Sequence, residues 1–208
     1  MINAARTARK SAIKDTKRAI ILEAAFKVFE KEGLEGANMR AIGEAAGYTA
    51  AAIYFHFPSK ESIYAELLSL SLDRLIEHVD AAVTNMKEPR ARFEAASLAF
   101  FDFYARHPRD LDLGFYLFRG GMQPRGISRE ANATLNAKLA RALREVGAAA
   151  RELGAGSRAV QQLEADVFAH AAGLLLMEHT GRIKMFGAHS RRLMETHIAR
   201  LLAQIEGY

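Results

Sequence analysis

Residues 39–57 read MRAIGEAAGYTAAAIYFHF, and this stretch decides the fold. Ile42 and Ala46 stand four residues apart, as on one face of a short helix, and Gly47 permits the positive φ of a tight turn. Ile53 supplies the apolar inner face of a second helix. Two short helices joined through a glycine form a helix-turn-helix, whose second helix can enter the major groove of DNA.

Capping residues, glycines and prolines set the helix boundaries along the chain. Asn38, Thr49 and Ser59 can each accept hydrogen bonds from the free N–H groups of a helix start, and Gly33 stops the helix before the motif. The predicted helices are 16–31, 39–46, 50–56, 60–86, 90–106, 109–118, 128–153, 157–180 and 190–205. About nine helices with almost no strand character predict an all-α fold. It consists of an N-terminal three-helix helix-turn-helix domain and a C-terminal helical bundle.

Charge is concentrated at the N-terminus. The 208 residues carry a net charge of +5, and residues 1–18 account for all of it. A basic arm on a neutral body indicates a polyanionic partner, nucleic acid before membrane, although a solvated tail fits the charge equally well. We therefore expect a basic flexible arm over 1–15, a DNA-binding domain over 16–60 and a ligand-binding and dimerisation domain over 61–208.

Composition narrows the class of protein. Hydrophobic residues make up 50% of the chain and cysteine is absent, which excludes a fully disordered chain and any disulfide scaffold. The longest apolar run, 171–177, is too short to span a bilayer. The N-terminus lacks the apolar segment of a signal peptide. A cytoplasmic protein with no membrane partner is expected.

Flanking residues extend the motif. Residues 21–25 read ILEAA, Phe29 and Gly33 follow, and residues 53–61 read IYFHFPSKE. With these additions, segment 16–66 closely resembles the TetR family of bacterial transcriptional regulators. The aromatic stretch ending in PSKE is its most specific part. Beyond this segment, the chain resembles the family only in length and helical texture.

The resemblance implies that the second helix of the motif reads DNA. The matching positions, together with those expected to contact phosphates, are Asn38, Arg40, Thr49, Ala50, Ala51, Ala52, Tyr54, His56 and Lys60. Three alanines offer only methyl contact, so DNA shape, or the arm in a minor groove, could contribute more than direct readout. Core packing is the alternative for Tyr54, and Phe55 and Phe57 are assigned to the core. Gly43 stands where relatives often carry alanine, and we expect the packing to survive either residue.

Aromatic residues are dense between 93 and 118. On the residues alone, an ordinary bundle core explains them. The resemblance instead favours a small-molecule pocket, because relatives usually bind an effector in this half. The predicted lining is Phe100, Phe103, Tyr104, Phe115, Phe118, Met122 and Phe168, with His170 as a polar group.

Surplus apolar surface on the last two helices predicts a homodimer through a four-helix interface, as the resemblance also implies. The predicted interface residues are Leu174, Met194, Ile198, Leu201 and Ile205. Packing within the monomer is the alternative. A twofold dimer would set its reading helices ~34–36 Å apart, facing a palindromic operator.

Motifs for catalysis, metal binding or cofactor binding are missing. Residues 154–159 fit a dinucleotide fingerprint formally but follow a helix rather than a strand. No cofactor, metal or enzymatic activity is therefore expected. The sequence favours a ligand-responsive DNA-binding repressor whose helix 60–86 links the two halves. The alternatives are a helical-bundle carrier or enzyme with a structural N-terminal corner, and a nonspecific architectural DNA binder.

Overall fold

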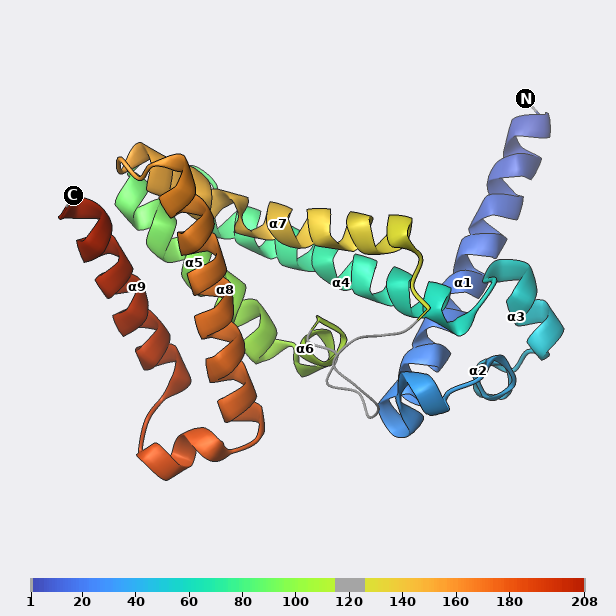
Figure 1. The fold of residues 1–208 in the computed structure, drawn as a ribbon. Helices are drawn as coiled ribbons and strands as arrows, with labels where there is room; N and C mark the ends of the chain where they lie inside the picture. Colours follow the sequence, from blue (N-terminus) through green and yellow to red (C-terminus); the bar gives the residue numbers. More distant parts are fainter. Residues whose placement is uncertain (1, 115–125, 208) are drawn as a thin grey trace. The chain divides into compact units, whose positions relative to one another are not determined.

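The computed structural model describes residues 2–114 and 126–207 (Figure 1). Within these residues the regular structure consists of nine α-helices and one 3₁₀-helix, without a strand. This confirms the predicted all-α class. The elements are α1 (Ile2–Gly36), α2 (Met39–Ala46), α3 (Ala50–His56), α4 (Lys60–Val83), α5 (Pro89–Arg106), α6 (Pro108–Gly114), α7 (Arg129–Glu152), α8 (Ser157–His179), η1 (Arg182–Phe186) and α9 (Ser190–Glu206).

Helix α1 begins earlier than the apolar periodicity indicates. Residues 2–15, expected as a flexible basic arm, are helical and continuous with the segment that follows. Gly33 interrupts the helix, as predicted, with φ 74° and ψ 167°, although helical turns resume to Gly36. The role of residues 2–15 as an arm stays a prediction.

The chain divides into two compact units. Among the described residues, unit 1 comprises those up to Ser69 together with 126–132. Unit 2 comprises the remaining described residues. The division falls inside α4, nine residues beyond the predicted boundary at residue 60. In unit 1, α1 packs on α2 and α2 packs on α3. Its core residues include Ile21, Ala25, Phe29, Ile42, Ile53, Phe57, Ile63 and Tyr64.

Unit 2 is built around α5, α8 and α9, each of which packs on the other two. Figure 1 shows α8 and α9 side by side, joined through η1. The apolar stripes of α8 and α9 pack against α5. Leu174, Met194, Ile198, Leu201 and Ile205 are all buried within the single chain, and their part in a dimer stays a prediction.

Among the described residues, no helix is both long enough and apolar enough to cross a membrane.

Candidate nucleic-acid interface

The start of α2 has the predicted cap. Asn38 Oδ1 accepts hydrogen bonds from the backbone N–H groups of Arg40, at 3.1 Å, and Ala41, at 2.9 Å. Asn38 and Arg40 are both exposed. The Arg40 side chain bonds to Glu44 on the next turn, with Nε 3.0 Å from Oε1. A phosphate would therefore compete with Glu44 for this guanidinium.

The turn between α2 and α3 depends on two glycines. Gly47 has φ 72° and ψ 28°, the left-handed conformation in which a side chain is disfavoured. Tyr48 N–H donates to the Gly43 carbonyl at 2.8 Å. A Cβ at Gly43 would lie 2.8 Å from the Tyr48 carbonyl oxygen. This corrects the expectation that alanine would fit here, because the obstacle is backbone and cannot rotate away.

Helix α3 presents a surface of small side chains. Thr49 Oγ1 accepts from Ala52 N–H at 3.2 Å, which confirms the predicted cap. Ala51 is exposed, and Ala50 and Ala52 are half-buried. Tyr54 is 56% exposed, which removes core packing as its explanation. The start of α3 can therefore approach another surface closely.

Phe55 was assigned to the core, and this assignment is wrong. Its side chain is 80% exposed, whereas Phe57 is 2% exposed as predicted. The reason is helical geometry: Ile53 and Phe57 stand four residues apart and share the inner face, so Tyr54 and Phe55 turn outward. An exposed tyrosine and an exposed phenylalanine thus lie side by side on α3.

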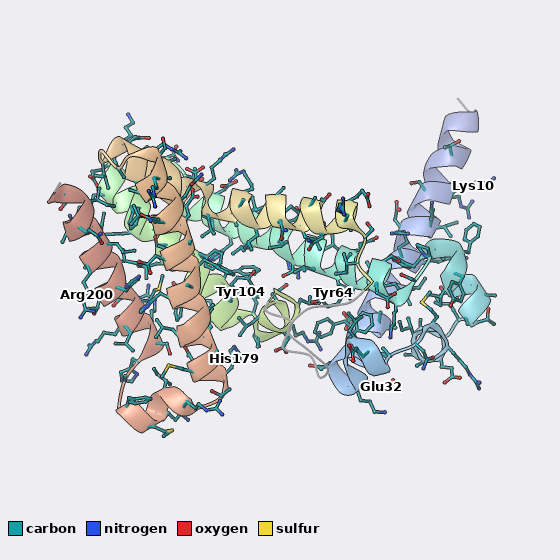
Figure 2. All side chains as sticks on the ribbon, viewed as in Figure 1. Lys10, Glu32, Tyr64, Tyr104, His179 and Arg200 are labelled. Carbon is teal, nitrogen blue, oxygen red and sulfur yellow. The ribbon has the colours of Figure 1, made fainter. Side chains whose placement is uncertain are left out.

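His56, the last residue of α3, lies close to the basic face of α1. Burial lowers its pKa, and the positive charges of Arg18, Lys17 and Lys14 lower it further. Lys14 and Lys17 are exposed, as is Lys10, which projects from the same helix (Figure 2). The cationic part of α1 therefore adjoins the C-terminal end of α3. The sequence showed this charge but not its helical placement.

Lys60 lies at the first turn of α4, as predicted, but its ammonium already has protein partners. Nζ donates to the carbonyls of Glu35, at 2.9 Å, and Ala37, at 2.8 Å. These contacts fasten the start of α4 to the end of α1. The predicted phosphate contact of Lys60 remains a prediction.

In unit 2, four of the predicted pocket residues come together. Phe100, Phe103 and Tyr104 are buried, and Phe168 is half-buried. Ring centroids lie 5.5 Å apart for Phe100–Tyr104, 5.3 Å for Phe103–Tyr104 and 5.9 Å for Phe100–Phe168, all edge to face. Phe115, Phe118 and Met122 lie outside the described residues.

His170 contacts a second histidine. Its ring stacks on His197, with centroids 3.8 Å apart. Burial lowers the pKa of His170, and the charge of His197 lowers it further. His197 in turn lies 3.2 Å from Asp166, measured from Nε2 to Oδ1. His170 thus belongs to a polar cluster between α8 and α9.

Unit 2 also contains an open cavity of about 540 Å³ that sequence reasoning missed. Its lining residues are Gly154, Ala155, Gly156, Ala159, Gln162, Leu163, Asp166, Leu201, Gln204 and Ile205. None of the predicted pocket residues is among them. The formal dinucleotide fingerprint at residues 154–159 is a loop leading into α8, so the missing strand excludes that interpretation.

Comparison with known proteins finds sequence likeness in the N-terminal part of the chain. Residues 21–67 match the family described as bacterial regulatory proteins, tetR family. The transcriptional activator FasR of Mycolicibacterium smegmatis is 37% identical over 90 residues, which is 43% of this chain and 41% of FasR. The transcriptional repressor KstR2 of Mycobacterium tuberculosis is 31% identical over 93 residues, 45% of this chain and 46% of KstR2. The match spans less than half of each relative.

The fold likeness extends further than the sequence likeness. FadR from Bacillus subtilis, solved in complex with stearoyl-CoA, aligns with a TM-score of 0.65 at 16% identity. The alignment covers 88% of this chain and 96% of FadR. At this identity the likeness shows the fold alone. By name, FasR is an activator of transcription and KstR2 a repressor.

Proposed function

We propose that this chain, whose residues 21–67 match the tetR family of bacterial regulatory proteins, is a sequence-specific DNA-binding repressor. It acts as a homodimer, and a small apolar or aromatic effector releases it from a palindromic operator. The observation that carries the proposal is the outward face of α3. There a capped helix start with methyl side chains is followed by exposed Tyr54 and Phe55.

The proposed DNA surface combines close approach with charge. The small side chains at the start of α3 let its backbone press against base edges, and methyl groups suit thymine. Lys14 and Lys17 beside the end of α3 suit phosphate contacts, which fix register without reading sequence. This arrangement assigns the basic residues to the DNA backbone and the outward residues of α3 to the groove.

The proposed effector site is the aromatic cluster around Phe100 and Tyr104. Its rings would favour an apolar chain or an aromatic ring. The structure of FadR with stearoyl-CoA supports the same ligand class for a protein of this fold. In the proposed mechanism, an effector that changes the separation of the two reading helices weakens binding to both half-sites at once.

Helix α4 is the proposed link between effector and DNA. In unit 2, Arg74 pairs with Asp110 of α6, and Asp73 and Asp80 pair with Lys138 and Arg141 of α7, both at 2.6 Å. In unit 1, the same helix holds Lys60 and Glu66 in contact with the helix-turn-helix domain. A displacement of α4 would therefore disturb named contacts in each unit.

The proposed dimer surface is the exposed face of α8 and α9. Ala165, Ala169, Gly173 and Leu176 recur at three- and four-residue steps and are all exposed. Leu193 of α9 is an exposed leucine as well. Small side chains on one helix face allow close approach of a second copy.

The proposal is tested with a duplex that the purified protein enriches from a random library. Tyr54→Ala should weaken binding to this duplex but barely change binding to a scrambled duplex, because Tyr54 lies on the reading face. Deletion of residues 1–15 should weaken both and reduce the salt dependence, because it removes phosphate contacts. If the deletion abolished binding while Tyr54→Ala changed nothing, the protein would be an architectural DNA binder instead.

A further inference from the structure

One arginine of α1 contacts the end of the recognition helix and α4 at the same time. Arg18 Nη1 donates to the His56 carbonyl at 2.7 Å. Arg18 Nη2 donates to the Glu66 carboxylate of α4. The guanidinium also lies over the Phe57 ring, with Cζ 4.1 Å from the ring centroid. All of these residues belong to unit 1.

Each contact has a physical reason to be specific. The His56 carbonyl is one of the last in α3 and has no partner within the helix, so a cation at this position also complements the helix dipole. The planar guanidinium can donate from separate nitrogens and stack on a ring, which an ammonium cannot do. Both Arg18 and Glu66 are only partly exposed, so solvent screens the pair less than a surface pair.

We infer that Arg18 is a positioning residue that holds the C-terminal end of the recognition helix on the first turns of α4. It does this without contacting DNA. Through Arg18, a shift of Glu66 with α4 changes the angle at which α3 meets the major groove. This inference rests on the proposed DNA-binding function and adds the residue through which α4 acts.

Lys60 also connects α4 to the rest of unit 1, but its contacts differ from those of Arg18. Lys60 holds the start of α4 on the carbonyls of Glu35 and Ala37, before α2. These two hydrogen bonds reach the end of α1 but not α3. Among the ion pairs and hydrogen bonds described for α4, the one through Glu66 and Arg18 leads to the end of α3.

Glu66→Gln tests this inference by whether it raises or lowers the affinity for DNA. Removing an acidic group from a DNA-binding domain should leave DNA affinity unchanged or raise it if only long-range charge matters. If Glu66 holds Arg18, and Arg18 holds α3, affinity for the enriched duplex should instead fall roughly tenfold. The slope of log affinity against log salt should not change, because no phosphate contact is lost.

Arg18→Met keeps much of the side-chain length and removes both hydrogen bonds. It should weaken binding by about the same factor as Glu66→Gln, and the double variant should be no weaker than Arg18→Met alone. Arg18→Lys should recover only part of the loss. Glu23→Gln is the matched control, since Glu23 forms an exposed pair with Lys27 on α1, and it should not lower the affinity.

Amide hydrogen exchange supplies a readout that needs no DNA. Glu66→Gln should speed exchange at the Phe57 amide, which donates to the Ile53 carbonyl at the end of α3, and leave the amides of α2 as they were. Uniformly faster exchange would mean a general loss of stability and would overturn the positioning role. So would a Glu66→Gln protein that binds as tightly as wild type. If wild-type protein enriches no duplex, the proposed function itself fails.

Discussion

At the scale of single residues, Gly43 is the most constrained position of the motif. A Cβ there would lie 2.8 Å from the Tyr48 carbonyl oxygen and 3.2 Å from the Ala50 nitrogen. Both atoms are backbone, so the turn itself must move. Gly43→Ala should therefore destabilise unit 1 by about 1–3 kcal/mol and weaken operator binding, as measured by thermal unfolding and duplex titration.

Gly36→Ala is the matched control. A Cβ at Gly36 would meet only the Glu32 Cβ at 3.6 Å, an ordinary contact, and Gly36 does not have a positive φ. Alanine should be tolerated there. Equal behaviour of the two variants would show that the α2–α3 turn relaxes more easily than its geometry indicates.

Residues whose role is local could be predicted from the sequence. Asn38, Thr49 and Gly47 act within four residues of themselves, and each has the predicted cap or turn role. Phe55 could not be placed, because a seven-residue helix leaves its outward positions undefined until Ile53 and Phe57 fix the inner face. The Arg18 contacts link residues 38 and 48 positions apart, which spacing along the chain cannot reveal.

At the scale of elements, α4 and α6 are joined by an asymmetric ion pair. Asp110 is buried, whereas the side chain of its partner Arg74 is half exposed. Arg74→Met leaves a carboxylate buried without that partner, but Asp110→Asn leaves a guanidinium that water can solvate. The arginine variant should be the less stable of the two by about 1–3 kcal/mol. Thermal unfolding of the two variants at neutral pH measures this difference in stability. If Asp110→Asn were the less stable variant, this account would be contradicted.

The contact between α8 and α9 should depend on pH through His170. Burial and the charge of His197 lower its pKa, with Asp166 acting in the opposite direction and Arg200 in the same one. The unfolded chain therefore binds a proton more readily, and stability rises with pH. The contribution is complete above about 6.5, the ordinary histidine value, and is lost as pH falls through the lower folded-state pKa.

His170→Gln should therefore show a smaller loss of stability on acidification from neutral pH than the wild-type protein. The measurement is the free energy of unfolding in urea across that interval. His189→Gln, which changes an exposed histidine, serves as the control for the loss of a histidine side chain. An unchanged slope in His170→Gln would assign the pH dependence to other groups.

Predicted elements follow the structure where caps and periodicity agree. The bounds of α2 and α3 match the prediction to the residue, and α4 to α9 begin or end within a few residues of it. The start of α1 was missed because residues 2–15 have no apolar stripe to signal a helix. The short η1 was missed because five residues carry too little periodicity. The apolar stripes of α8 and α9 are present as predicted. Their packing on α5 could not be predicted, because only the folded chain brings these helices together.

At the scale of the whole molecule, the proposed dimer depends on the exposed face of α8. Leu176 is 47% exposed there, and Leu70 of α4 is 43% exposed. Leu176→Arg should convert dimer to monomer in sedimentation equilibrium and weaken operator binding strongly, since one protomer engages only one half-site. Leu70→Arg changes an equally exposed leucine and should leave the dimer intact. A Leu176→Arg protein that remained dimeric would move the interface elsewhere.

The central claim is that two copies of α3 read a defined sequence. Its most direct test is selection of bound duplexes from a random library with the purified wild-type protein at two salt concentrations. The account predicts a palindrome at both, with half-site centres ~34–36 Å apart, about one helical turn of DNA. Binding that enriches no sequence and collapses at the higher salt would contradict it, because only charge would then hold the protein on DNA.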